Sequence, residues 1–140
     1  MKDTVGRSVG MLSNLIRRKF SSFSFHDTLS PAQGKVLHFI LVRSAECDVF
    51  QKDVEEEYSL RPPTATKILK DMEMNGLIRR EAVPYDARLK RIIATPKALQ
   101  YRDLIHESLE ETESTLTAGV SDEDLETFFR VINQMIRNMS

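Results

Sequence analysis

The sequence predicts a mainly α-helical fold with one small β-hairpin, arranged as a winged helix-turn-helix with further helices at both ends. Three features of its 140 residues predict this class. Apolar residues recur at three- and four-residue intervals over much of the chain, which is the period of amphipathic helices. Residues 51–75 have the pattern of two short helices joined by a tight turn, and residues 77–94 that of two strands joined by a turn. A helix pair followed by a hairpin is the element order of a winged helix-turn-helix.

The first two helices are predicted from apolar spacing and from capping residues. The first covers roughly residues 4–22, and a polar and aromatic connector follows it. At Ser30-Pro31-Ala32-Gln33 a second helix begins, because Ser30 can cap it, Pro31 fits its first position and Gln33 can bond back to the cap. Its apolar face continues to about Arg43. The apolar stripe of the first helix consists of Val5, Val9, Leu12, Ile16, Phe20 and Phe23.

The helix-turn-helix is predicted between residues 51 and 76. Its first helix, roughly residues 51–57, is short and acidic, and residues 58–60 form the turn. The second helix begins after Arg61 at two prolines, where missing backbone N–H groups cost little because those donors have no partner in the helix. Gly76 supplies the left-handed residue that ends this helix.

The second of these helices has two distinct faces. Ala65, Ile68, Leu69 and Met72 form its inner stripe. The outer face carries short side chains near its N-terminus and lysines further along, which suits contacts to base edges and then to phosphates. A solvated helix face with two lysines is the alternative interpretation.

The hairpin is predicted from two strands, Leu77–Val83 and Leu89–Ala94, with residues 84–88 as the connection. Arg88 flanks the tip, where an arginine can enter an A·T-rich minor groove, and Asp86 could orient it. The alternative is a hairpin turn stabilised by an aspartate, with a solvated arginine. The predicted DNA contacts are Gln51, Arg61, Pro62, Pro63, Thr64, Thr66, Lys67, Lys70, Arg79, Arg88 and Lys90.

The last 45 residues are predicted to form two helices. One long helix, capped by Thr95, is broken near Ala118-Gly119, and Ser121 caps a final amphipathic helix. Its stripe matches that of the first helix, so we expect the two to pack together and against a second subunit. Packing within one chain is the alternative. The 140 residues then form one unit, with residues 30–95 as the DNA-binding part and residues 1–24 and 96–140 as the dimerisation part.

Charge distribution supports a polyanion as the partner of the middle segment. Residues 61–96 carry eight basic and four acidic side chains, whereas residues 97–140 carry four and nine. A basic middle and an acidic end are typical of a module that binds nucleic acid through one region only. Ordinary surface variation is the alternative.

Enzyme, metal and membrane classes are not supported by the sequence. The single cysteine, Cys47, excludes an internal disulfide, and the separated His26, His38 and His106 predict no zinc site. We find no glycine-rich phosphate loop and no Ser/His/Asp constellation, so we expect neither catalysis nor a cofactor. Without a signal peptide pattern or a stretch long enough to span a membrane, the chain is expected to be cytoplasmic.

The order of these elements resembles the MarR family of bacterial winged-helix regulators. By this resemblance, the chain is expected to be a homodimeric repressor or activator on a pseudo-palindromic operator, with Arg88 as the wing arginine and residues 62–75 as the recognition helix. Two positions depart from the pattern: Phe50 replaces a frequent Thr or Ser cap, and Ala98 replaces a frequent glycine. The resemblance is carried by Ser30-Pro31-Ala32-Gln33, Gln51-Lys52-Asp53-Val54, Pro63-Thr64-Ala65-Thr66-Lys67-Ile68-Leu69, Glu73-Met74-Asn75-Gly76-Leu77-Ile78-Arg79-Arg80, Asp86-Ala87-Arg88 and Thr95-Pro96-Lys97.

These observations predict a sequence-specific regulator of transcription that binds double-stranded DNA as a homodimer, with repression favoured over activation. A small-molecule effector could release it from DNA by changing the spacing of the two recognition helices. The alternative is a protein-interaction scaffold without DNA activity, which would be expected to lack the basic wing. Candidate effector-pocket residues, with ordinary core packing as the alternative, are Met11, Phe20, Phe25, His38 and Tyr101.

Overall fold

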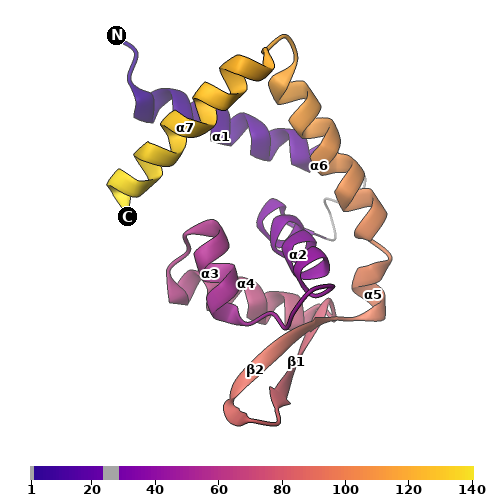
Figure 1. Cartoon of the computed structure of the whole chain (residues 1–140). Helices are drawn as coiled ribbons and strands as arrows, with labels where there is room; N and C mark the ends of the chain where they lie inside the picture. Colours follow the sequence, from indigo (N-terminus) through magenta and orange to yellow (C-terminus); the bar gives the residue numbers. More distant parts are fainter. Residues whose placement is uncertain (1, 24–28) are drawn as a thin grey trace.

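The computed structural model describes residues 2–23 and 29–140, and it confirms the mainly helical fold with one hairpin. Helices α1, α6 and α7 lie on one side of the molecule, and α2, α3 and α4 lie on the other with the hairpin projecting from them (Figure 1). In order, the elements are α1 Val5–Ser21, α2 Pro31–Arg43, α3 Gln51–Tyr58, α4 Pro62–Met74, β1 Ile78–Val83, β2 Asp86–Ala94, α5 Pro96–Leu99, α6 Arg102–Thr117 and α7 Asp122–Met139.

The helix starts follow the local chemistry of their caps. Ser30 and Gln33 form the expected reciprocal capping box at α2, and the Ser121 hydroxyl accepts from the backbone N–H of Asp124 at α7. At α3, Phe50 cannot cap with its side chain. Instead, the Asp53 carboxylate accepts from the Phe50 backbone N–H at 2.9 Å, so the helix starts where expected despite the replaced cap.

One core joins the helix-turn-helix to the base of the hairpin. Its residues come from α1, α2, α3, α4, both strands, α5 and α6, and most are completely buried. The backbone N–H of Ile92 also donates to the carbonyl of Val49 at 2.7 Å, which ties β2 to the connector before α3. The hairpin base is therefore fixed on the helical body. Among the core residues are Leu37, Ile40, Val54, Leu69, Met72, Leu77, Ile92 and Ile105.

Two predicted boundaries were wrong. The second strand starts at Asp86 rather than Leu89, because a short turn at residues 84–85 joins the strands, with a register shift between Ala82 and Val83. The predicted long helix after Thr95 divides into α5 and α6 at Gln100 and Tyr101, where backbone bonds run to the third residue back.

The division between α5 and α6 has a tertiary cause. The Lys97 Nζ donates to the carbonyl of Asn75 at 2.7 Å, and the Thr95 hydroxyl donates to that of Gly76, so α5 is held against the end of α4. Helix α6 instead packs against α1 and α2. Since the two segments are anchored to different elements, the chain turns between them, and the helix propensity added by Ala98 does not decide the outcome.

A tyrosine joins α3 to α2. The Tyr58 hydroxyl donates to the backbone carbonyl of Lys35 at 2.8 Å, and the Tyr58 ring meets the Phe39 ring edge to face with centroids 6.1 Å apart. Burial, with a smaller contribution from the charge of Glu57, raises the pKa of Tyr58 to about 12. The phenol therefore keeps its proton, and this bond, throughout the neutral range.

We expect Tyr58→Phe to lower the free energy of unfolding by about 1 kcal/mol, because it removes one partly buried hydrogen bond and leaves the ring in place. Urea denaturation followed by circular dichroism measures this change. Tyr85, which is 69% exposed at the hairpin turn, provides the control, and Tyr85→Phe should leave the unfolding midpoint unchanged. Equal midpoints for the two variants would show that the bond between α3 and α2 does not stabilise the fold.

None of the helices that the structure describes combines the length and apolar character needed to cross a membrane.

Candidate nucleic-acid interface

Helix α4 has the two faces that its sequence predicts. Ala65, Leu69 and Met72 are completely buried, whereas Lys67 and Lys70 are exposed. Among the described residues, Lys67 pairs only with Asp71, at 3.5 Å and exposed to solvent, a type of contact that contributes little and leaves the ammonium available. The exposed surface of α4 and its cap includes every predicted contact from this segment, namely Arg61, Pro62, Pro63, Thr64, Thr66, Lys67 and Lys70.

The start of α4 combines the side chain of Arg61 with the positive end of the helix dipole. Arg61 is the cap residue in extended conformation, and it makes no side-chain capping bond. Its exposed guanidinium therefore lies beside the positive end of the helix dipole, which favours an anion such as phosphate. The backbone adds no free donor there, because Pro62 and Pro63 have no N–H and the Thr64 N–H donates to the Arg61 carbonyl. The tight turn before it is made by Ser59 with a φ of 52°, which places α3 and α4 against each other.

Gln51 does not project freely from the start of α3, as a simple phosphate contact would. Its Nε2 donates to the Thr66 hydroxyl at 2.9 Å and to the Glu55 carboxylate at 3.1 Å. Its Oε1 accepts from Nη1 of Arg80 at 3.5 Å. One carboxamide thus joins α3, α4 and β1, and sequence reasoning included neither Glu55 nor Arg80 in the site.

The hairpin has two chemically different faces. Alternate residues of a strand and their cross-strand partners share a face. By this rule Arg80, paired with Ile92, lies on the same face as Lys90, which is paired with Ala82. Ile92 is buried in the core and Arg80 reaches Gln51, so this face is the one turned toward α3 and α4.

The cations on the other face of the hairpin are neutralised by carboxylates. Arg79 pairs with Glu81 at 3.3 Å, and Arg91 pairs with Glu81 at 3.4 Å and with Asp48 at 3.6 Å. Lys90, in contrast, forms no ion pair within the described part of the chain. We call the face with Arg80 and Lys90 the unneutralised face, because neither side chain forms an ion pair within the described residues. The predicted contact Arg79 lies on the other face, and the predicted contact Arg88, near the turn, pairs with Asp86.

At the turn of the hairpin, the carboxylate of Asp86 orients Arg88. It accepts from the Arg88 backbone N–H at 2.9 Å and from the guanidinium at 3.2 and 3.3 Å. These bonds lower the pKa of Asp86, so its carboxylate stays charged at neutral pH. The Arg88 side chain is 91% exposed, and Arg88 belongs to β2 of the hairpin, which projects from the body of the protein (Figure 1). A pre-oriented exposed guanidinium suits insertion into a minor groove.

The candidate effector residues are distributed over different environments. Met11 is exposed on α1, Phe20 is buried in the core, and His38 and Tyr101 are partly buried. Phe25 lies outside the described residues. His38 of α2 stacks on His106 of α6 with ring centroids 5.9 Å apart, and burial followed by the charge of His106 lowers the pKa of His38. Within residues 2–23 and 29–140, no group of three or more His, Cys, Asp or Glu side chains could hold a metal ion.

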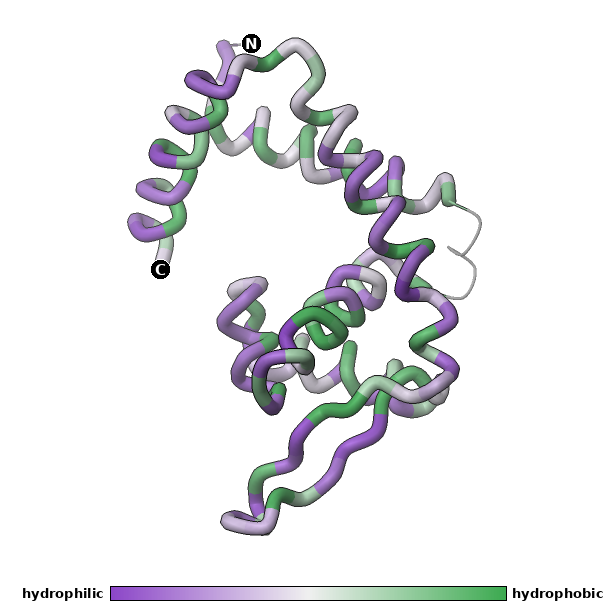
Figure 2. Tube along the Cα trace, turned by 45° about the vertical axis from the view of Figure 1, so that its right-hand side comes forward, coloured by the Kyte–Doolittle hydropathy of each residue, from purple (hydrophilic) through white to green (hydrophobic). Residues whose placement is uncertain are grey.

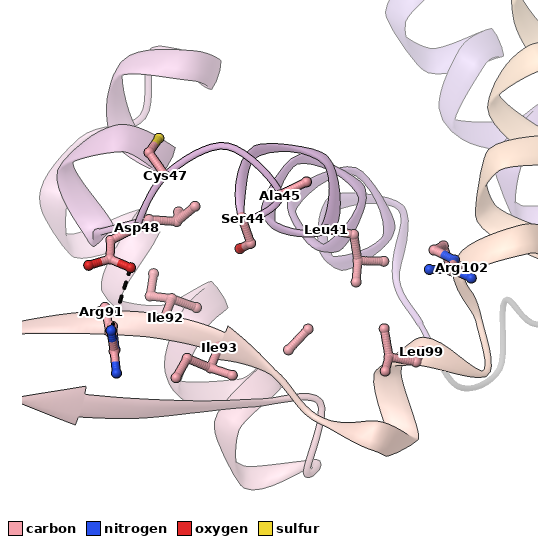
Figure 3. A pocket seen from close by; sticks show the side chains of 12 residues that line it. Leu41, Ser44, Ala45, Cys47, Asp48, Arg91, Ile92, Ile93, Leu99 and Arg102 are labelled. Atoms are coloured by element: carbon pink, nitrogen blue, oxygen red, sulfur yellow. Dashed lines mark ion pairs between the residues drawn. The ribbon is translucent and has the colours of Figure 1, made fainter.

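A cavity of about 380 Å³ opens between α2, the connector before α3, β2 and the start of α6 (Figure 3). Its walls are apolar in the middle, with the Arg91 and Asp48 ion pair at one end and Arg102 beside Leu99 at the other. None of the candidate effector residues that the structure describes, Met11, Phe20, His38 and Tyr101, lines it. Sequence patterns could not indicate it, because its lining comes from segments far apart in the chain: Leu41, Ser44, Ala45, Cys47, Asp48, Val49, Arg91, Ile92, Ile93, Ala94, Leu99 and Arg102.

Comparison with known proteins agrees with this geometry. The MarR family model matches residues 27–89, which include the helix-turn-helix and most of the hairpin. The curated protein YybA of Bacillus subtilis, described as an uncharacterized HTH-type transcriptional regulator, is 21% identical over 133 residues, which cover 95% of this chain and 87% of that protein.

Solved structures give the same result over the whole chain. The transcription regulator MarR of Oenococcus oeni matches with 27% identity and a TM-score of 0.84, covering 96% of this chain and 99% of that one. The structure of an S. aureus MepR-DNA complex shares the fold, with 20% identity, a TM-score of 0.88 and coverage of 98% and 97%. The chain is therefore similar to winged helix-turn-helix transcription regulators of the MarR family, whose family model matches its residues 27–89.

Proposed function

We propose that the protein is a homodimeric repressor that reads a pseudo-palindromic operator, with α4 in the major groove and the hairpin in the flanking minor groove. The observation that carries the proposal is the continuity of two surfaces. The outer face of α4 and the unneutralised face of the hairpin meet through the bonds of Gln51 to Thr66 and to Arg80. A helix and a cationic ribbon joined in this way match the two grooves of one duplex. That the related S. aureus structure is a DNA complex supports the same proposal.

A second subunit is proposed because the N- and C-terminal helices leave their apolar stripes uncovered. No residue of α7 is buried, and Phe20 is the only buried residue of α1. Apolar positions recur along both helices (Figure 2), and those exposed on them include Val5, Val9, Leu12, Phe128 and Ile136. Large apolar surfaces exposed on a monomer are typical of an interface with another protein chain.

A two-fold symmetric dimer through these helices would place two copies of α4 on successive major grooves, which are roughly 34–36 Å apart. A dimer bound to an operator in this way would repress transcription by covering the promoter. We further propose that a small molecule bound between the helical layer and the winged part, near Met11, Phe20, Phe25, His38 and Tyr101, changes this spacing and releases the DNA.

A gel shift with the DNA upstream of the protein's own gene, in the presence of excess nonspecific competitor, tests the proposal. We expect a competitor-resistant complex, a footprint with two-fold symmetry, and a dimer mass by light scattering. The affinity should fall steeply with salt, as it does for proteins that neutralise several phosphates. A monomer, or binding that nonspecific DNA removes completely at low salt, would favour a protein-interaction scaffold instead.

A further inference from the structure

We infer that Gln51 is a positioning residue that fixes the direction in which the Thr66 hydroxyl points toward DNA. Through its bond to Gln51, Arg80 makes this direction depend on the position of the hairpin. The inference rests on the proposed function, because it concerns how the same surface reads a base pair. It assigns roles to Gln51 and Arg80 that differ from a direct phosphate contact.

The hydrogen bonds of Gln51 fix the orientation of its carboxamide. An amide side chain has two N–H donors on nitrogen and an acceptor on oxygen. Here the nitrogen donates to the Thr66 hydroxyl at 2.9 Å and to the Glu55 carboxylate at 3.1 Å, and the oxygen accepts from the Arg80 guanidinium. A reversed amide would place its oxygen against the carboxylate of Glu55 and its N–H groups against the guanidinium. Both contacts would be repulsive, so one orientation is selected.

The fixed amide determines what Thr66 can do. A threonine hydroxyl has one O–H donor and two acceptor lone pairs. Since Thr66 accepts from Gln51, its own proton remains available for a second acceptor, and Thr66 is exposed on the outer face of α4. Such a donor suits N7 or O6 of guanine, N7 of adenine, O4 of thymine or a phosphate oxygen. Gln51 thus makes Thr66 a directed hydrogen-bond donor.

Arg80 connects this donor to the hairpin. It is partly buried on the face turned toward α3, and its Nε is buried without a hydrogen-bond partner in the described structure. Its one side-chain bond within the described structure is the 3.5 Å contact to Gln51, the longest of the three bonds of that carboxamide. A shift of the hairpin would lengthen this weak contact first. The orientation of Thr66 therefore responds to the position of the wing.

A double-mutant cycle between Gln51→Leu and Thr66→Val tests the inference in the full-length protein. Affinity is measured by fluorescence anisotropy for the operator and for a set of operators with single base-pair changes. We expect each single variant to lose about tenfold in affinity, as for one hydrogen bond, and to lose discrimination at the same base pair. In the Thr66→Val background, Gln51→Leu should change affinity by less than about twofold, because its effect passes through Thr66.

Other roles for Gln51 give different results in the same cycle. If Gln51 binds a phosphate directly, or only stabilises the fold, its loss should weaken all operators equally, and the two effects should multiply to about a hundredfold. Either result would overturn the inference. Thermal unfolding checks that the variants are folded, with Gln100→Leu, at an exposed position that ends α5, as the matched control. Gln51→Glu is the second variant, since a glutamate is nearly isosteric but cannot donate to Thr66.

The contribution of Arg80 is separated by comparing it with Lys90 on the same hairpin face. Lys90→Met should weaken all operators, and it should reduce the slope of log affinity against log salt by about 0.9 for each lost phosphate contact. Arg80→Met should leave the slope of log affinity against log salt unchanged. It should alter operator affinity in the protein that has Thr66, but not in the Thr66→Val background. A reduced slope for Arg80→Met would show that Arg80 binds phosphate and would overturn its linking role. If the unmodified protein bound no operator specifically, the proposed function itself would fail, which is a different outcome.

Discussion

Ile136→Asp is expected to convert the protein from a dimer to a monomer and to reduce operator affinity by at least about a hundredfold, because one monomer can hold only one half-site. Ile136 is 53% exposed on α7 in the single chain. An aspartate at this position is therefore solvated in the monomer and should not disturb its fold. The substitution is unfavourable only in the dimer, where a second subunit would bury the aspartate at position 136.

The location of Ile136 explains the size of this effect. Together with Val5 and Val9 of α1, and Tyr58 of α3, it lines an apolar cavity of about 820 Å³. A second subunit that fills this space would bury an unpaired carboxylate, which costs about 3–5 kcal/mol. Two-fold symmetry places the same charge in both halves of the interface, so the dimer is destabilised by this free energy twice.

Light scattering and operator binding measure this prediction together. Gln134→Asp is the matched control, because Gln134 lies two residues from Ile136 and thus about 200° around the helix, on the polar side of α7. It should remain a dimer with unchanged affinity. A dimeric Ile136→Asp with normal affinity would show that α7 does not form the interface.

The sequence predicted the elements whose boundaries depend on local chemistry. Ser30, Ser121 and Thr95 each cap a helix where expected, because a cap depends on residues within one turn. The exposed and buried faces of α4 were also predicted correctly, since they follow from helical spacing alone.

What the sequence could not predict depends on contacts between distant residues. The division between α5 and α6 arises because Lys97 and Thr95 bond to the carbonyls that end α4, about twenty positions earlier. The network around Gln51 has the same origin, because its partners lie fifteen and twenty-nine residues away.

The two faces of the hairpin were only partly indicated by its sequence. Strand alternation places Ile78 and Arg80 on one face, so an inward Arg80 could have been inferred from the buried Ile78. The second carboxylate partner of Arg91, Asp48, could not have been inferred, because it belongs to a segment outside the hairpin.

Arg88 and Arg91 both pair with carboxylates, but Arg88 is 91% exposed with one partner, and Arg91 is 38% exposed with two, so we expect their removal to have different effects. Arg88→Ala should weaken operator binding by about tenfold to a hundredfold and lower the salt slope by about 1.8, since a dimer loses two cationic contacts. Arg91→Ala, which removes a cation already paired with Asp48 and Glu81, should leave the slope unchanged. Anisotropy titrations at several salt concentrations measure both values.

The chemical identity of the cation at position 88 separates minor-groove insertion from simple attraction to phosphate. Asp86 holds the guanidinium through its Nε and Nη2 atoms, which is a fork that an ammonium cannot reproduce. Arg88→Lys keeps the charge, so the salt slope should be preserved while the preference for A·T pairs beside the half-site is lost. If Arg88→Lys behaved like the unmodified protein, Arg88 would act only as a charge near the backbone. If Arg88→Ala left both affinity and slope unchanged, the hairpin would not contact DNA, and specificity would have to come from α4 alone.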